Sequence, residues 1–189
     1  EDKMAVFAVL MRLREICCDP RLVADNWDGG SAKLDACMEL VTAAVEGGHR
    51  ILLFSQFTSM LELLAKRLDE AGVSHFTLQG STPKPVRAEL VRRFNSGEAD
   101  VFLISLRAGG TGLNLTAADI VIHYDPWWNV AAQNQATDRA YRIGQRNPVQ
   151  VYKLIAQDTI EEKIVELQQA KQDLAETVTG SADGAILSM

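Results

Sequence analysis

Between residues 51 and 156 the sequence alternates short apolar runs with segments of helical periodicity. Short apolar runs bounded by turn signals are typical of buried strands, and apolar residues three and four apart are typical of helices. Consecutive parallel strands need a long crossover connection, usually a helix. The alternation therefore predicts an α/β fold with a parallel sheet covered by helices. The expected strands are 51–54, 74–78, 101–104, 119–124 and 149–156, and the expected helices between them are 57–71, 83–94 and 129–141.

Two helical segments precede this alternation and one follows it. Residues 3–16 carry apolar side chains at helical spacing, and Ser31 is placed to cap a helix over residues 32–46. Asp158 begins the last helix in a pattern that resembles a capping box. The apolar sides of the first and last helices are Val6, Val9, Leu10, Leu13 and Ile16, and Ile160, Ile164, Leu167 and Leu174. We expect three parts: an N-terminal helix and turn (1–30), the α/β lobe (31–157), and a C-terminal helix with a tail that frays from Thr179 (158–189).

Charge limits the kind of partner that the chain can bind. The 189 residues carry a net charge of −6, and the segment from Asp158 onward holds seven acids against two lysines. The first 157 residues are therefore near neutral. This argues against an electrostatic grip on nucleic acid over the whole surface but allows a local basic patch. The cluster of Lys84, Arg87, Arg92 and Arg93 is either such a patch or a solvated helix face.

The sequence shows neither a membrane segment nor a metal site. No apolar run approaches the roughly 20 residues that a spanning helix needs, so we expect no membrane contact. Three cysteines without a CxxC pair indicate neither a disulfide framework nor a zinc site, and a reduced, intracellular compartment fits best. His75 and His123 lie in expected strands without partners at metal-ligand spacing, so we interpret both as structural.

A glycine-rich loop, Arg107–Gly112, follows the third expected strand. Three glycines within four residues let a backbone approach a phosphate closely, and ligands of open parallel sheets bind beyond the carboxyl ends of the strands. A tight loop without a ligand is the alternative. The loop is not a Walker A motif, because no Gly-Lys-Ser/Thr follows. It is not a dinucleotide fingerprint, because Leu115 occupies the third glycine position.

The expected helix near residues 129–142 carries aligned polar and basic side chains. Gln135, Arg139 and Arg142 are spaced at i, i+4 and i+7, which places them in one narrow sector of a helix. Two aligned arginines can clamp a polyphosphate, because each guanidinium is a fixed fork of donors with a permanent charge. Ion pairing with nearby aspartates is the alternative. The small residues Ala132, Ala136 and Ala140 form a second stripe that lets the helix lie close to the sheet.

Two adjacent tryptophans, Trp127 and Trp128, follow the fourth expected strand. Both cannot easily be buried, so we expect one to stay accessible as a stacking or insertion element. The alternative is that both pack on the sheet where the next helix begins.

Four segments resemble successive motifs of one helicase family. The family is the SWI/SNF-type ATPases of helicase superfamily two. In chain order, its motifs IV, V, Va and VI are resembled by ILLFSQF (51–57), LISLRAGGTGLNL (103–115), DIVIHYDPWWN (119–129) and QATDRAYRIGQ (135–145). The same family order continues with LRxxCxxP near Leu13–Pro20, SAKLDAC (31–37) and LQGSTP…R…F (78–94). The resemblance covers about residues 10–175, and four motifs in order make it specific.

In that family the motor has two RecA-like lobes with ATP between them, and this chain resembles the second, C-terminal lobe. The resemblance implies a RecA-like parallel sheet flanked by helices on both faces. It also implies ATP and Mg²⁺ as cofactors, both bound mainly by the first lobe, with double-stranded DNA and that N-terminal lobe as partners. The P-loop and the DEAH-type acidic motif of a first lobe are not in this sequence. We expect the isolated chain to be an intracellular monomer without ATPase activity, from the cytoplasm or nucleoid if bacterial and from the nucleus if eukaryotic.

The resemblance assigns roles toward the nucleotide to six residues. Arg142 resembles the arginine finger, Arg139 its companion, and Gln135 the glutamine that organises the phosphate and the attacking water. The loop that couples nucleotide state to DNA corresponds to Gly110, Gly112 and Asn114.

Four further residues are assigned to the nucleic acid. Ser55, Gln56 and Thr111 resemble residues near the phosphates of the tracked strand, and Trp128 resembles the tryptophan that touches the DNA groove. Thr111 stands where leucine is common, which leaves its role less defined. Other departures from the family pattern are Asp19, Val130 and Tyr141.

The sequence thus predicts the C-terminal motor lobe of an ATP-dependent double-stranded-DNA translocase or remodeller. A RecA-like module that binds nucleic acid or protein without a motor is one alternative. An RNA-directed helicase of the same superfamily is another, and the WWN…RIGQ pattern argues against it.

Overall fold

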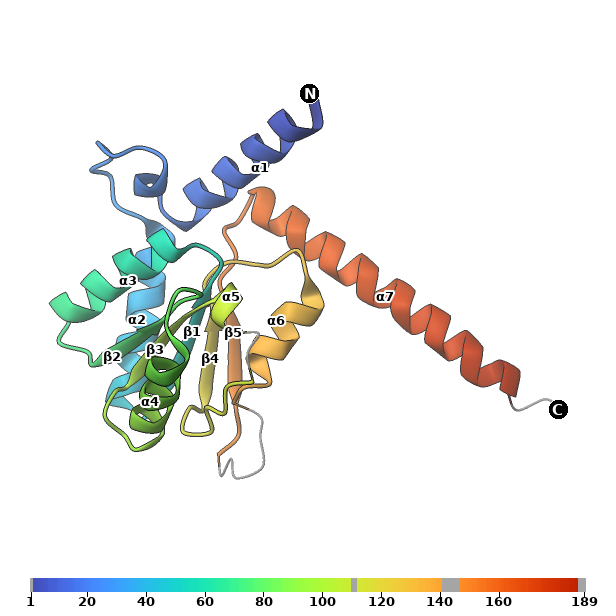
Figure 1. The fold of residues 1–189 in the computed structure, drawn as a ribbon. Coiled ribbons are helices and arrows are strands. Elements are labelled where there is room, and N and C mark those ends of the chain that lie inside the picture. Colours follow the sequence, from blue (N-terminus) through green and yellow to red (C-terminus); the bar gives the residue numbers. More distant parts are fainter. Residues whose placement is uncertain (1, 110–111, 141–146, 187–189) are drawn as a thin grey trace.

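The computed structural model describes residues 2–109, 112–140 and 147–186. In these residues a single sheet is formed by β1 (Ile51–Ser55), β2 (His75–Leu78), β3 (Val101–Ser105), β4 (Ile120–His123) and β5 (Gln150–Lys153). The strand order is β2-β3-β1-β4-β5, and all four neighbouring pairs are parallel (Figure 1). The predicted parallel sheet is confirmed.

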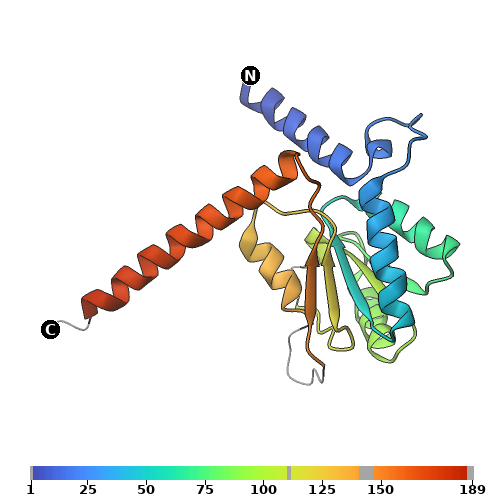
Figure 2. The ribbon, with the colours of Figure 1, turned by 180° about the vertical axis from the view of Figure 1, so that it is seen from behind.

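Helices cover both faces of this sheet (Figures 1 and 2). One face carries α2 (Ala32–Glu46) and α3 (Thr58–Glu70), the other carries α4 (Lys84–Asn95) and α6 (Val130–Thr137), and the short α5 (Leu106–Gly109) follows β3. Successive side chains of a strand point to opposite faces. In β1, Ile51 and Leu53 pack with α2 and α3, whereas Leu52 and Phe54 pack on the side of α4 and α6. The central strand is therefore apolar along its length because both of its faces are buried.

The first helix, α1 (Asp2–Cys18), reaches away from the sheet (Figure 1). The side that the sequence predicts to be apolar stays largely exposed: Val6 and Val9 are each 58% exposed, and Leu10 is partly buried. The helix is instead buried through Arg14 and Cys18, near its C-terminal end. The apolar side of α1 is thus not part of the described core.

The last helix, α7 (Ile160–Ile186), begins two residues later than predicted. Asp158 has a φ of 56°, so it does not adopt the extended backbone of an N-cap residue. Thr159 lies next to the helix instead, and its Oγ1 accepts a hydrogen bond from the backbone N–H of Glu161 at 3.2 Å. At the start of α2, by contrast, the predicted cap is confirmed, because Ser31 Oγ accepts from a first-turn N–H at 3.3 Å.

The expected apolar face of α7 is buried only near the start of the helix. Ile164 is fully buried, whereas Leu167 is 50% and Leu174 66% exposed. The helix also continues past Thr179, where we expected the tail to fray. These differences follow from the direction of α7, which leaves the body after its first turns (Figure 1).

Two other predicted segments are shorter in the structure. The helix expected over 129–141 is α6, which ends at Thr137. The strand expected over 149–156 is β5, and its four residues are exposed. β5 is at the edge of the sheet and has one neighbour, β4, so it does not need the apolar composition of a central strand.

The described residues contain no helix that is long and apolar enough to cross a membrane. In the same residues no group of three or more His, Cys, Asp or Glu side chains is placed to hold a metal ion. Cys17, Cys18 and Cys37 are free thiols. The limits of the three parts, 1–30, 31–157 and 158–189, stay predictions.

Candidate nucleotide and nucleic-acid interface

Most of the predicted site residues within the described part of the chain lie at or just beyond the carboxyl edge of the sheet. β1 ends at Ser55, and β4 leads into the segment from Asp125 to Asn129. Because β1 pairs in register with both β3 and β4, their carboxyl ends meet at one edge. This is where open parallel sheets bind ligands.

Ser55 is fixed inside the protein by Asp125. Its Oγ donates a 2.5 Å hydrogen bond to Asp125 Oδ1, and the backbone N–H of Gln56 donates to Asp125 Oδ2 at 3.2 Å. Burial raises the pKa of Asp125 to about 6, against the opposing effect of the Ser55 hydrogen bond. The Ser55 hydroxyl therefore does not reach the surface, whereas Gln56, a second residue predicted to lie near the phosphates of the tracked strand, is partly exposed.

The two tryptophans have different surroundings, as the sequence predicts. Trp127 is fully buried and packs edge-on against Phe54 and His123, at centroid distances of 6.1 and 5.4 Å. The side-chain amide of Gln168, on α7, donates to the carbonyl oxygen of Trp127. Trp128 is partly exposed. Trp127 thus anchors the segment, and Trp128 is the tryptophan available to a ligand.

Arg14 of α1 holds the same segment from the other side. Its guanidinium donates to the carbonyl oxygen of Pro126 at 3.1 Å and lies 5.5 Å from the Phe57 ring and 5.7 Å from the Trp128 ring. Burial lowers the pKa of Arg14, and the nearby Asp125 carboxyl opposes that effect. Sequence reasoning did not assign Arg14 or Asp125 to the site. The only signal was their position inside motif-like segments, since they are 111 residues apart in the chain.

Of Gln135, Arg139 and Arg142, the helix α6 presents only Gln135 on its surface. Gln135 is exposed on α6, whereas Arg139 follows the end of the helix and is 3% exposed. The predicted alignment of the two on one helix is therefore wrong, because α6 ends at Thr137. Arg142 lies outside the described residues.

A buried histidine connects β4 to α6. His123 Nε2 lies 2.8 Å from Thr137 Oγ1, and its ring stacks on Phe54 with centroids 5.5 Å apart. Burial lowers the pKa of His123 to about 4, so the ring is neutral at physiological pH. The prediction that His123 is structural agrees with this geometry.

The described part of the glycine loop borders an open pocket. Gly112 has a φ of 59°, in the left-handed region that favours glycine, and Asn114 is exposed. The pocket has a volume of about 810 Å³ and is lined by residues that include Gly80, Pro83, Arg87, Gly112 and Asn114. Gly110 and Thr111 lie outside the described residues.

One backbone hydrogen bond joins this loop to the segment after α6. The N–H of Leu115 donates to the carbonyl oxygen of Arg139 at 3.1 Å. The two segments that resemble motifs V and VI are therefore in contact through the main chain at Leu115 and Arg139.

The donor set at this edge fits the phosphates of a nucleotide better than its metal ion. The exposed amide of Gln135 can donate to a phosphate oxygen. Mg²⁺ prefers carboxylate oxygens, and the described residues supply no cluster of them.

Comparison with known proteins identifies relatives among ATP-dependent helicases and SWI/SNF-related proteins. Residues 32–144 match the family described as "Helicase conserved C-terminal domain". The chain is 41% identical over 180 residues to an ATP-dependent helicase of Mycoplasma pneumoniae, covering 92% of this chain and 17% of that protein. It is 39% identical over 184 residues to "SWI/SNF-related matrix-associated actin-dependent regulator of chromatin subfamily A member 1" of Homo sapiens, covering 90% and 18%. The chain thus spans about a sixth of the length of these relatives.

A solved structure has the same fold. The C-terminal part of the Fun30 ATPase domain superimposes with a TM-score of 0.71 at 33% sequence identity, covering 83% of this chain and 53% of that chain. This neighbour confirms the predicted RecA-like architecture. Together with the match over residues 32–144, it shows that the chain belongs to the helicase C-terminal domain family, among the SWI/SNF-type ATP-dependent helicases.

Proposed function

We propose that this chain is the C-terminal motor lobe of an ATP-dependent double-stranded-DNA translocase or remodeller. The observation that carries the proposal is the meeting of nucleotide-type and DNA-type residues at one sheet edge. The glycine loop follows β3 at that edge, and Gln56 and Trp128 follow β1 and β4 there. Gln135 lies on α6, which begins directly after Asn129. Because both sets of residues are attached to one rigid sheet, a movement of the nucleotide-type residues can be passed on to the DNA-type residues.

Toward the nucleotide, Gln135 and Arg142 act on the phosphates of an ATP held mainly by the N-terminal lobe of the same polypeptide. The buried Arg139 is the companion of Arg142. ATP with Mg²⁺ supplies the phosphoryl group for hydrolysis. Phosphoryl transfer depends on positioning and charge stabilisation, and an arginine supplied across an interface raises the rate by roughly 10³–10⁵. Closure of the two lobes assembles the site, so the isolated chain does not hydrolyse ATP.

Toward DNA, Trp128 contacts a groove of the double helix, and Gln56 lies near the sugar-phosphate backbone of the tracked strand. Arg14 and Asp125 act as positioning residues. Arg14 holds the carbonyl of Pro126 and the ring of Trp128, and Asp125 holds the backbone of Gln56. A fixed aromatic side chain loses little conformational freedom when it binds.

Two contacts support coupling between the halves. His123 joins the end of β4 to α6 through Thr137, and Leu115, which follows the glycine loop in the chain, joins that segment to Arg139. Because the segment that carries Trp128 follows β4 in the chain, a shift of α6 would reach the DNA side through buried, hydrogen-bonded groups.

The test is ATP turnover by the two-lobe protein, with and without double-stranded DNA, in wild type and in Arg142→Ala. We expect turnover to rise with DNA and to fall by at least about 10³-fold in Arg142→Ala. Arg92→Ala is the matched control, because Arg92 is an exposed arginine on α4 that pairs with Glu89 at 2.7 Å. It should leave turnover unchanged.

Other outcomes separate the alternatives. If ATP turnover is the same with and without DNA, or the same in wild type and Arg142→Ala, the motor proposal is contradicted. The binding-module alternative is then favoured. Stimulation by RNA in place of DNA would favour an RNA-directed helicase. ATP turnover by the isolated chain would contradict the assignment of the phosphate-binding loop to a first lobe.

A further inference from the structure

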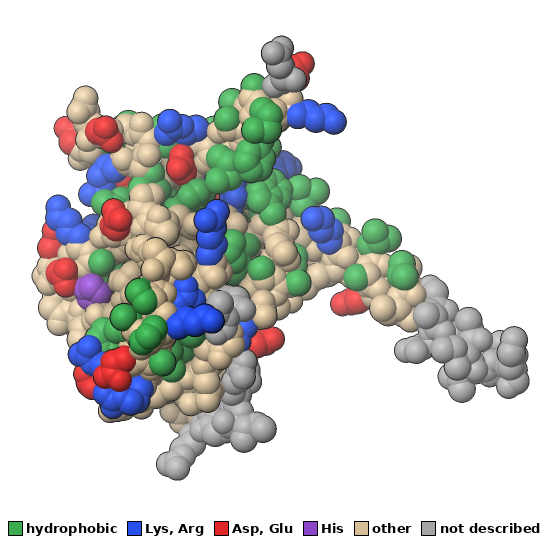
Figure 3. Space-filling view, in the orientation of Figure 1, with side chains coloured by type: hydrophobic (Ala, Val, Ile, Leu, Met, Phe, Trp, Pro, Cys, Tyr) green, Lys and Arg blue, Asp and Glu red, His purple; other side chains and the backbone are tan. Residues whose placement is uncertain are grey.

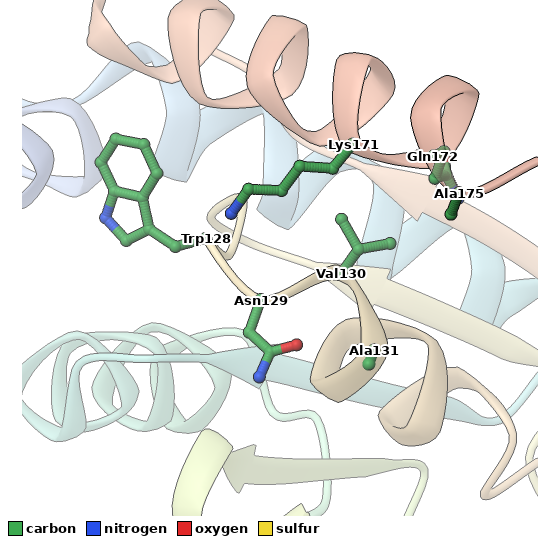
Figure 4. Close-up of a pocket in the computed structure, with 7 residues that line it drawn as sticks. All are labelled: Trp128, Asn129, Val130, Ala131, Lys171, Gln172 and Ala175. Atoms are coloured by element: carbon green, nitrogen blue, oxygen red, sulfur yellow. The ribbon is translucent and has the colours of Figure 1, made fainter. Parts of the chain in front are cut away.

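A groove lies between α7 and the start of α6, next to Trp128 (Figure 4). It has a volume of about 510 Å³ and is lined by Trp128, Asn129, Val130, Lys171, Gln172 and Ala175, together with Ala131. Its lining contains no carboxylate. The groove therefore combines an aromatic ring, amides and one cation, without a charge that would repel an anion.

The cation, Lys171, is available to a ligand. α7 has only two lysines, and Lys163 pairs with Glu166 at 3.0 Å. Lys171 makes no ion pair with any residue of the described ranges. Its helical neighbours at i±3 and i±4 are uncharged, namely Leu167, Gln168, Leu174 and Ala175. Figure 4 shows the side chain extending from α7 toward Trp128.

The acidic residues of α7 lie on its other side. At about 100° per residue, the exposed and partly exposed acids fall roughly opposite Lys171. These acids are Glu162, Glu166, Asp173 and Glu176. The strongly negative helix thus presents its one unpaired lysine toward the groove and its carboxylates away from it.

Asn129 adds hydrogen-bond donors to the same groove. Its Oδ1 caps α6 by accepting from the backbone N–H of Ala132 at 3.2 Å. The Nδ2 amide group then keeps its donors for a ligand. A cation, an amide donor and a partly exposed tryptophan together match a nucleic-acid strand, which offers phosphate oxygens and flat sugar or base surfaces.

We propose that this groove is a second contact with the DNA backbone, in which Lys171 Nζ binds a phosphate next to the position reached by Trp128. The proposal rests on the proposed function, since it extends the DNA surface from the sheet edge onto α7. It also gives α7 a role in holding DNA despite its net negative charge.

The test is binding of double-stranded DNA by the two-lobe protein, measured by fluorescence anisotropy from 50 to 200 mM salt. Lys171→Gln should weaken binding several-fold and make the slope of log K against log[salt] shallower by about 0.9, the value for one phosphate contact. Lys171→Arg should restore most of the affinity. Lys163→Gln is the matched control, a charge removed from the same helix, and should leave the slope unchanged.

The outcomes distinguish this proposal from the proposed function. If the two-lobe protein binds DNA and Lys171→Gln and Lys163→Gln give equal salt slopes, the proposed DNA contact in the groove is wrong. The proposed function is not affected by that result. Such a result would point to an acidic peptide as the occupant of the groove. No DNA binding by wild type would instead contradict the proposed function itself. Lys171 is exposed, so circular dichroism should show both variants folded.

Discussion

Buried polar side chains at the end of β4 determine how single residues respond to pH. His123 and Asp125 are each 1% exposed and lie two residues apart in the chain. Burial shifts both toward their neutral forms, lowering the pKa of His123 to about 4 and raising the pKa of Asp125 to about 6. The two groups therefore affect stability in opposite directions over one pH range.

For His123, the unfolded chain takes up a proton near pH 6.5 and the folded chain only near pH 4. Its contribution to stability is present above pH 6.5 and is lost as the pH falls toward 4, about 3 kcal/mol in all. In Asp125→Asn, where the opposing group is removed, we expect the free energy of unfolding to fall on acidification from pH 7 to pH 4.5. Urea denaturation at each pH measures it.

For Asp125, the folded chain keeps its proton up to about pH 6 and the unfolded chain releases it near 3.8. Its contribution is present below pH 3.8 and is lost as the pH rises through 6, again about 3 kcal/mol. His123→Gln should therefore gain stability on acidification relative to wild type. The wild type, with both groups, should vary less than either variant. Parallel pH profiles for all three proteins would contradict this account.

At the scale of elements, a buried ion pair joins α2 to α7. Lys33 Nζ, on α2, contacts Glu161 Oε1 on α7 and also donates to the carbonyl oxygens of Tyr124 and Leu154, at 2.9 and 3.1 Å. Glu161 in turn accepts from the backbone N–H of Ala156 at 2.8 Å. Both side chains are nearly inaccessible. The pair fixes the start of α7 against the body.

Removal of one partner should leave an uncompensated buried charge. We expect Lys33→Met to lower the free energy of unfolding by about 3–5 kcal/mol, and the double variant Lys33→Met/Glu161→Leu to recover most of that loss. Guanidinium denaturation of Lys33→Met, Glu161→Leu and the double variant measures the coupling free energy between the two side chains. If the double variant is as unstable as Lys33→Met, the carbonyl contacts of Lys33 matter more than its charge.

The sequence was enough to predict elements that are buried on two faces. ILLF and VFLI are predicted to be strands of a sheet covered by helices, and they form β1 and β3, which are buried along their length. Prediction was poorer where burial is one-sided or absent, as in the exposed β5 and along the apolar side of α1. Periodicity shows that a face is apolar but not whether another element covers it.

For the candidate site, residue types within motifs could be predicted but their partners could not. Gln56 and Trp128 lie at the surface near the sheet edge. The contacts that position them come from Asp125 and Arg14, and such pairs form only after distant segments fold together. The end of α6 at Thr137 also separates Arg139 from Gln135 in a way that a helical wheel does not show.

At the scale of the whole molecule, the charge is divided between a near-neutral body and an acidic α7. The net charge of −6 opposes DNA at long range, because like charges repel over roughly the Debye length of 10 Å at 0.1 M salt. We expect the isolated chain to bind double-stranded DNA weakly, at the 10⁻⁴ M end of the usual non-specific range of about 10⁻⁴–10⁻⁶ M. Anisotropy at 150 mM salt measures it, and submicromolar binding there would contradict the expectation.

The order of the strands has a consequence for synthesis of the chain. β1 is the middle strand, yet its partners β3 and β4 begin at residues 101 and 120. At roughly 5–20 residues per second, β1 leaves the ribosome on the order of seconds before either neighbour exists. During that time a strand with four successive apolar residues has two open edges, each a template for pairing with another nascent chain. The sheet can therefore close around β1 only after residue 123 has left the ribosome, and until then β1 is open to pairing with other chains.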